Sequence, residues 1–304
     1  MFVALSWSMA VVESTERLLQ TVYRGPVKRV AHATGLNELL EWGLWAGYRT
    51  LNGGTKTLRI GGETATFGVP TRSTLGVLSV AETVERPIYR DLLAHVRPDD
   101  VFWDVGANVG TYSCLVGSRL ADGDGTVVSF EPYPPTVALL ERNLRRNGVD
   151  ASVAPLALGD ADGTTELALR YDDEPGSQEH TLAARYRESA AVLETVSVPV
   201  RRGDTLVDEG SLPEPNVLKI DVEGIGPAVL AGLESTLSND ACRRLYVEPH
   251  ENADELESAL AGFGFEVTRR YLGRHRSNRN PILVAVRAQG EGASGEVARP
   301  LRQE

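Results

Sequence analysis

The chain has 304 residues, of which 42% are hydrophobic and 24% charged, so it is long enough to bury a sizeable core in one large domain. A formal net charge of −11 at pH 7 speaks against a protein that functions on nucleic-acid phosphates or on anionic lipid. Its two cysteines, Cys114 and Cys242, exclude a disulfide framework and a cysteine-based zinc site, and they fit a reducing compartment. We therefore expect a cytoplasmic protein.

Residues 13–50 are expected to form a helical cap that packs on the main domain. Residues 1–12 are apolar but too short to span a bilayer, and they lack the positive leader of a secretory signal. Between residues 13 and 50, apolar side chains recur at helical steps: Leu36, Leu39, Leu40, Trp42 and Trp45. The Trp-rich face leaves two alternatives open, a homodimer contact and a contact with a membrane surface.

A hairpin and a short helix follow. Residues 57–60 and 64–67 alternate in polarity around Gly61-Gly62, a dipeptide that suits a tight turn. The spacing of apolar residues over 88–96 predicts a helix that ends before Pro98.

From residue 100 onward, expected strands alternate with expected helices. The expected strands are 100–105, 125–130, 151–156, 216–220, 244–247, 265–271 and 282–286, with extended pieces at 166–170 and 195–200. The expected helices are 112–120, 134–147, 226–237 and 253–262. This alternation predicts βαβ units, and therefore an α/β fold of the doubly wound kind with a mainly parallel sheet.

Three parts are expected along the chain: an N-terminal helical and hairpin extension over 1–85, the main domain over 86–288 and a disordered tail over 289–304. Within the main domain, residues 171–188 are polar and charged. They predict a long loop of the kind that often forms a lid or a binding element.

The strongest chemical signal is a glycine-rich loop over residues 104–110, which joins an apolar strand to a helix. Glycines let the backbone turn sharply and approach a ligand that a Cβ would exclude. The spacing is G-x-x-x-G and not the G-x-G-x-x-G of dinucleotide folds, and Asp104 precedes it. An acid at this point would repel a pyrophosphate but could orient a cationic aminoacyl sulfonium, which favours S-adenosylmethionine as the cofactor.

A second signal is Glu131, in the tripeptide Phe-Glu-Pro that ends the second strand of the domain. It lies 131 − 110 = 21 residues after the last glycine of the loop. An acid about 20 residues past such a loop accepts hydrogen bonds from ribose hydroxyls. We therefore expect Glu131 to bind the ribose of the cofactor.

These motifs together resemble the FkbM-type methyltransferase family. The resemblance covers roughly residues 86–287 and rests on the following segments: Asp104 to Gly110, Tyr112-Ser113, Phe130-Glu131-Pro132, Asn143, Asn147, Ala157 to Asp160, and Lys219 to Gly224. It implies a seven-stranded, Rossmann-like class I methyltransferase fold that uses S-adenosylmethionine and mostly methylates hydroxyl oxygens. The acceptor would be a small molecule or a sugar, not nucleic acid.

The resemblance also implies residue roles. The residues implied to bind the cofactor are Asp104, Gly106, Asn108 and Gly110 at the methionine part, Glu131 at the ribose, and Leu156, Ala157, Leu158 and Asp160 at the adenine. Lys219, Asp221 and Glu223 would face the methyl-transfer centre. The family usually carries an acid where this chain has Gly226, so the polar network on the substrate side is expected to differ.

Transfer to a hydroxyl is helped by a base close to the acceptor. The candidates are Asp221 and Glu223 after one apolar strand and His250 after the next, and His250 is attractive because its unperturbed pKa lies near neutrality. A divalent metal held by Asp221 and Glu223 would have too few ligands, so no metal is expected. Two other functions stay open: an NAD-linked oxidoreductase, and a non-catalytic protein that keeps the cofactor pocket.

Overall fold

The computed structural model describes residues 37–170, 173–177, 180–182, 192–222, 226–249, 253–271 and 281–288. Its centre is a seven-stranded sheet in the order β12-β13-β11-β10-β3-β4-β5. The strands are β3 (Val101–Val105), β4 (Thr126–Phe130), β5 (Ala151–Ala154), β10 (Val217–Ile220), β11 (Arg244–Val247), β12 (Phe265–Tyr271) and β13 (Ile282–Arg287). All pairs from β11 to β5 are parallel, and β13 runs antiparallel to both of its neighbours. The α/β fold with a mainly parallel seven-stranded sheet is confirmed.

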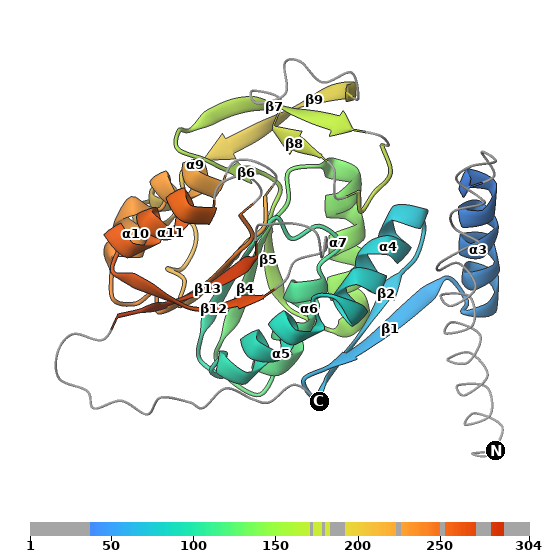
Figure 1. Ribbon diagram of the computed structural model, residues 1–304, viewed down its shortest axis with the longest axis horizontal. Coiled ribbons are helices and arrows are strands. Elements are labelled where there is room, and N and C mark those ends of the chain that lie inside the picture. The colour runs from blue at the N-terminus through green and yellow to red at the C-terminus, as the bar shows by residue number, and fades with distance from the viewer. Residues whose placement is uncertain are drawn as a thin grey trace.

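Helices cover both faces of this sheet (Figure 1). On one face lie α4 (Arg72–Thr83), α5 (Arg86–His95), α6 (Thr111–Leu120) and α7 (Pro134–Asn147); on the other lie α8 (Gly203–Asp208), α9 (Gly226–Ala231), α10 (Glu234–Ser238) and α11 (Ala253–Gly262). Because successive side chains of a strand point to opposite faces, Phe102 joins one hydrophobic core and Trp103 the other. Both residues are fully buried.

The N-terminal part of the described chain is a helix followed by a hairpin. Helix α3 (Asn37–Leu51) leads into β1 (Thr55–Ile60) and β2 (Glu63–Gly68), which pair antiparallel around the glycine turn, as expected. The hairpin shares the core of the α4–α7 face, where Leu58 and Phe67 are fully buried. The expected boundary at residue 85 stays a prediction. Among helices within the described ranges, none combines the length and apolar character needed to cross a bilayer.

A second, four-stranded sheet was not expected. It has the order β6-β9-β7-β8 and consists of β6 (Ala157–Leu158), β7 (Gly163–Arg170), β8 (Thr181–Leu182) and β9 (Val192–Arg201). The two extended pieces expected at 166–170 and 195–200 lie within its long antiparallel pair, β7 and β9. Figure 1 shows this sheet at one end of the main sheet, above α7 and α9. The segment expected to be a loop therefore contains strand β8.

Two further elements differ from expectation. Helix α4 was missed, and the helix expected over 226–237 is broken into α9 and α10. The break lies at Gly232. Its carbonyl oxygen accepts a hydrogen bond from the backbone N–H of Asp204 at 2.9 Å. A Cβ added at this position would lie only 1.9 Å from the carbonyl oxygen of Gly159. The Asp204 carboxylate then accepts from the backbone N–H of Ser235 and Thr236 at the start of α10. Contacts with another part of the chain therefore interrupt the helix.

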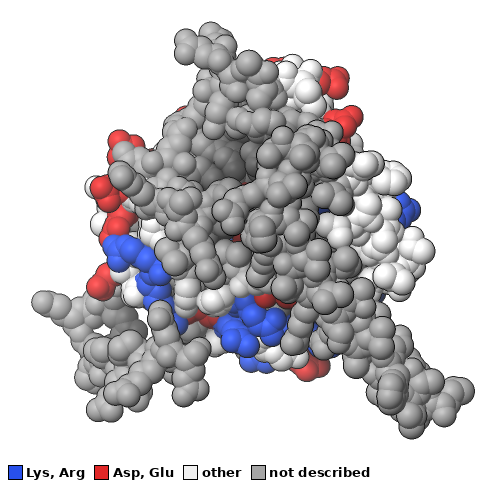
Figure 2. All heavy atoms as spheres, turned by 45° about the vertical axis from the view of Figure 1, so that its right-hand side comes forward, with Lys and Arg blue, Asp and Glu red and all other residues white. Residues whose placement is uncertain are grey.

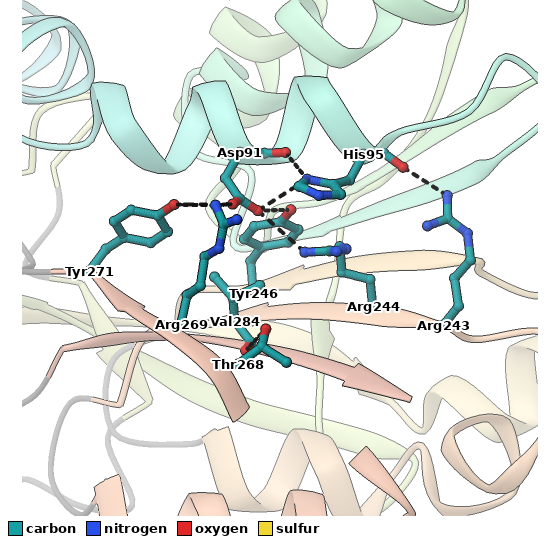
Figure 3. Close-up of polar contacts among 9 residues, drawn as sticks. All are labelled: Asp91, His95, Arg243, Arg244, Tyr246, Thr268, Arg269, Tyr271 and Val284. Carbon is teal, nitrogen blue, oxygen red and sulfur yellow. Dashed lines mark hydrogen bonds and ion pairs between the residues drawn. The ribbon is translucent and has the colours of Figure 1, made fainter. Parts of the chain in front are cut away.

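A buried carboxylate ties α5 to the far strands of the main sheet (Figure 3). Asp91 Oδ1 accepts hydrogen bonds from Tyr246 at 2.8 Å and Arg244 at 3.3 Å, and its Oδ2 accepts from Arg269 at 2.5 Å and Tyr271 at 3.0 Å. Burial alone would raise the pKa of Asp91, but hydrogen bonds from His95 and Tyr246 and nearby positive charge hold it well below its usual value. We call this set the Asp91 cluster.

Candidate functional site

The glycine-rich loop follows β3 and opens α6 at the carboxyl edge of the main sheet. Three of its residues have a positive φ: Gly106 at 77°, Asn108 at 49° and Gly110 at 84°. The backbone N–H groups of Gly106 and Ala107 both donate to the carbonyl oxygen of Phe130, at 3.1 and 2.9 Å. The loop is therefore anchored to the end of β4, in the crevice where open α/β sheets bind ligands.

Gly106 is required by the chain's own packing. A Cβ at this position would lie 2.1 Å from the carbonyl oxygen of Asp221, which an L-residue could not tolerate, and φ is also unfavourable for one. The sequence suggested that the missing Cβ made room for a ligand. In the structure it makes room for the end of β10.

Three charged side chains predicted for the site lie together at this edge. Lys219 Nζ lies 3.2 Å from Asp104 Oδ1 and 3.6 Å from Asp221 Oδ2, and it donates to the Gly106 carbonyl at 2.8 Å. Lys219 and Asp104 are register neighbours on β10 and β3, which places them on the same sheet face. Their side chains are 6% and 0% exposed, whereas that of Asp221 is 33% exposed. Asp221 is therefore the member of this triad that a ligand could reach.

Lys219 is a buried cation between two carboxylates. Burial would lower the pKa of Lys219, but the carboxylates of Asp104 and Asp221 raise it, so the ammonium stays charged. Asp104 Oδ2 in turn accepts from the Ser113 backbone at 3.1 Å and from the Ser113 hydroxyl at 2.6 Å. Ser113, which the sequence marked only as part of a motif, thus fixes the orientation of Asp104 from the first turn of α6.

Two stacked tyrosines lie against the triad, and sequence reasoning assigned them no role. The rings of Tyr89 and Tyr112 are 3.9 Å apart at 16°, and Lys219 Nζ lies 5.1 Å from the centre of the Tyr112 ring. Tyr112 also donates a long hydrogen bond of 3.5 Å to Glu85. Burial, followed by the charge of Glu85, raises the pKa of both phenols well above the usual value, so both stay protonated at neutral pH. No sequence spacing links Tyr89 to Tyr112, since they come from different helices.

Glu131 lies at the end of β4, where the sequence placed it. Its Oε1 accepts from the backbone N–H of Tyr133 at 2.9 Å and its Oε2 from that of Asn108 at 3.0 Å. Burial raises the pKa of Glu131 to about 7, against the lowering effect of these two N–H groups. The side chain therefore gains or loses a proton near neutral pH.

Asn108 contacts a segment of the long loop expected over 171–188. Its amide Nδ2 donates to the Ser177 carbonyl at 3.1 Å, while its Oδ1 is buried and accepts no hydrogen bond from the described residues. A buried acceptor without a donor is costly, so this oxygen is suited to meet a donor on a ligand.

Asn143 and Asn147, part of the family motif, join the loop to the hairpin. Asn143 donates to the Val109 carbonyl at 2.9 Å and accepts from the Gly68 N–H at 3.0 Å. Asn147 accepts from the Thr66 N–H at 2.7 Å and donates to the Thr66 carbonyl at 2.9 Å. The outer edge of β2 is thus satisfied by side chains of α7.

The residues expected at the adenine lie after β5. Ala157 and Leu158 form the buried strand β6, and Leu156 packs against the same core as Leu158. Asp160 is exposed, and its backbone carbonyl accepts from Arg202 at 2.9 Å. Ala157 and Leu158 therefore belong to the second sheet, and the whole segment follows Glu131 along the chain.

Two of the candidate bases, Glu223 and His250, lie outside the described residues. Gly226, the position where the family usually has an acid, is buried at the start of α9. Within the described ranges, no group of three or more His, Cys, Asp or Glu side chains could hold a metal ion.

The chain is similar to known proteins of one family. The model of the methyltransferase FkbM domain matches residues 104–278. The chain is 32% identical over 170 residues to the hexuronic acid methyltransferase AglP of Haloferax volcanii. The aligned region covers 56% of this chain and 64% of that protein, so the chain spans just under two thirds of that relative's length. It is 28% identical to the 31-O-demethyl-FK506 methyltransferase FkbM of Streptomyces tacrolimicus, covering 66% of this chain and 89% of that one. A crystal structure of methyltransferase FkbM from Methylobacillus flagellatus aligns with a TM-score of 0.46 and 17% identity, covering 71% of this chain and 53% of that chain.

Proposed function

Because residues 104–278 match its domain, the chain belongs to the FkbM family of S-adenosylmethionine-dependent methyltransferases, and we propose that it methylates a hydroxyl oxygen of a small molecule or sugar. The observation that carries the proposal is the accessible carboxylate of Asp221 beside the buried ammonium of Lys219, next to the glycine-rich loop. Such a carboxylate can accept a proton from an acceptor hydroxyl. One relative is named as a methyltransferase of a hexuronic acid and another as a methyltransferase of 31-O-demethyl-FK506, and both names support an oxygen acceptor.

The residues around the loop fit the cofactor. Glu131 offers a buried carboxylate to the ribose hydroxyls. The buried Oδ1 of Asn108, which accepts no hydrogen bond within the described part of the chain, offers an acceptor to the ammonium of the methionine part. Gly106 and Gly110 shape the loop, Asp104 orients Lys219, and Leu156, Ala157, Leu158 and Asp160 would line the adenine. When bound, S-adenosylmethionine supplies an electrophilic methyl group on a positively charged sulfur.

The chain's own residues would position the acceptor and take its proton. As the acceptor oxygen bonds to the methyl carbon, the methyl–sulfur bond breaks and the hydroxyl proton passes to a base, leaving a methyl ether and a neutral thioether. Asp221 is the described base candidate, and we propose Glu223 and His250 as further ones. Lys219 would hold the Asp221 carboxylate in place.

The type of bond formed tests the proposal. Incubated with methyl-labelled S-adenosylmethionine and hydroxyl-rich glycan acceptors, including a uronic acid, the protein should give a labelled product that keeps its label in mild alkali. A methyl ether withstands this treatment, whereas a methyl ester on the uronic carboxylate releases labelled methanol. Alkali-labile label would overturn hydroxyl methylation, and label transfer to none of the acceptors by a cofactor-binding protein would favour a non-catalytic role.

Binding of the cofactor product, S-adenosylhomocysteine, should release about half a proton at pH 7 if the ribose hydroxyls donate to ionised Glu131, whose pKa is about 7. Below pH 7 the affinity should fall by up to about tenfold per pH unit, because a larger fraction of Glu131 must first lose its proton. Calorimetry in two buffers of different ionisation enthalpy measures this release. Glu131→Gln should remove it and weaken binding, and an unchanged proton count in this variant would refute the ribose assignment.

A further inference from the structure

A second pocket, of about 670 Å³, lies between α3 and α7, away from the cofactor loop. Trp45 and Arg49 line it from α3, and Leu139, Arg142 and Arg146 line it from α7. The backbone of Gly68, at the end of β2, lies on its floor, where an added Cβ would lie 3.1 Å from the Arg146 guanidinium. Nothing in the proposed methyl transfer uses this pocket.

Among the described residues, the three arginines of this pocket have no neutralising partner. No described carboxylate forms an ion pair with Arg49, Arg142 or Arg146. Arg49 instead lies 5.3 Å from the centre of the Trp45 ring, and Arg146 donates to the amide oxygen of Asn143 at 3.2 Å. Arg145, which also lies on α7, forms an ion pair with Glu141 at 3.5 Å. Arg145 does not line the pocket. Positive charge is therefore concentrated inside the pocket.

An exposed apolar strip continues from the pocket along α3. Leu39 and Trp42 are 69% and 56% exposed, large values for apolar side chains. Leu39, Trp42, Ala46 and Arg49 stand at positions i, i+3, i+7 and i+10, which share one helix face. The same face of α3 thus carries apolar side chains towards its start and a cationic pocket towards its end.

We propose that this pocket and strip dock the protein on an anionic membrane surface, with a lipid phosphate between the arginines and the Leu39–Trp42 strip in the interface. Arginine pairs with phosphate through two parallel hydrogen bonds, and tryptophan is favoured where a membrane meets water. A free phosphate would use the arginines but leave the apolar strip exposed, and for this reason we favour a lipid.

The net charge of −11 opposes a general attraction to anionic lipid, so the docking rests on local positive charge. At physiological salt, charges more than about 8 Å apart are largely screened, so the local arginines dominate at the contact. On the face shown in Figure 2, basic side chains form small groups with acidic ones beside them, not one continuous field. The docking is therefore expected to be weak and reversible, and to depend on the pocket and not on overall charge.

Co-sedimentation of the full chain with vesicles tests the proposal. The protein should bind vesicles of phosphatidylcholine with phosphatidylglycerol and not vesicles of phosphatidylcholine alone. An arginine near an anionic surface contributes about a fivefold factor to partitioning, so Arg142→Gln should weaken binding about fivefold and the double variant with Arg146→Gln about 25-fold. Trp42→Ala should weaken binding through the apolar strip. Arg145→Gln is the matched control, since it removes the same charge from the same helix outside the pocket.

Four outcomes would overturn the proposal. The first is that the wild-type chain binds neither kind of vesicle, and the second is that the wild type and the double variant bind equally well. The third is that Arg145→Gln weakens binding as much as Arg142→Gln does. The fourth is that inorganic phosphate binds in calorimetry while vesicles do not. The last result would indicate a site for a free anion. Arg142→Gln keeps the test sharp. Both arginines are exposed, but Arg146 also donates a hydrogen bond to Asn143, so the loss of Arg142 alone should leave the melting temperature unchanged.

Discussion

Replacing Asp91 by alanine should lower the free energy of unfolding by about 3–5 kcal/mol at neutral pH, the usual cost of removing one partner from a buried ion pair. Asp91 is 5% exposed and accepts hydrogen bonds from two arginines and two tyrosines of β11 and β12. Without the carboxylate, Arg244, whose side chain is 12% exposed, keeps a desolvated charge. Denaturant unfolding of both proteins measures the difference.

The pH dependence of this difference has a definite sign. The pKa of Asp91 is lowered in the folded state, so its contribution is complete above the unfolded value of about 4 and is lost as the pH falls below it. The wild type and Asp91→Ala should therefore converge in stability in acid. Glu257→Gln is a matched control. Glu257 forms an ion pair with Arg270, which follows Arg269 in β12, but both side chains of this pair are at least 36% exposed. The loss of unfolding free energy should therefore be at most about 1 kcal/mol. An equal loss in the two variants would contradict a special role for the Asp91 cluster.

Asp221→Asn should lower kcat by about 10²–10⁴ while leaving the fold and the affinity for S-adenosylmethionine intact, if Asp221 takes the acceptor proton. The amide keeps the shape of the side chain but removes its charge and basicity. The fold should survive because Lys219 keeps its ion pair with Asp104 and its hydrogen bond to Gly106. Turnover is measured on the acceptor that gives alkali-stable label.

A surface acid separates this effect from a change in overall charge. Asp208 at the end of α8 is exposed, and Asp208→Asn should keep full activity. Full activity in Asp221→Asn would move the reaction centre towards Glu223 or His250. A loss that follows the melting temperature or the cofactor affinity would instead assign Asp221 a structural role.

Much of the fold was predictable from residue 100 onward because glycine and proline mark its boundaries. The expected helices over 134–147 and 253–262 match α7 and α11 to the residue, and Gly148 ends α7 in the left-handed conformation. Helix α4 was missed because its sequence is rich in Ser, Thr, Val and Gly, which are poor helix formers. Its hydrogen-bonded Thr71 cap and the burial of Val77, Leu78 and Ala81 outweigh that preference.

The positions of site residues could be predicted where a motif directly follows a strand. Contacts between residues of different helices could not be predicted. Asp104, Glu131 and Asp221 could be placed at one edge because parallel strands end on the same side of a sheet. The stacked Tyr89 and Tyr112 could not, since nothing in a single sequence reports which helices will touch. The role of Gly106 was predicted only in part, because its need for space depends on Asp221, which follows it by 221 − 106 = 115 residues.

The strand order has a consequence for how the chain emerges from the ribosome. Strand β3 pairs with β4 soon after both are made, but its other partner is β10, and the paired residues Phe102 and Val217 are 217 − 102 = 115 positions apart. At typical rates of synthesis, one edge of β3 stays open for roughly ten seconds. That edge carries the apolar run Val-Phe-Trp-Asp-Val, the kind of strand that invites pairing with another nascent chain. Slow translation between β5 and β10 would lengthen this exposure, so yield on overexpression should depend on how quickly residues 155–220 are made.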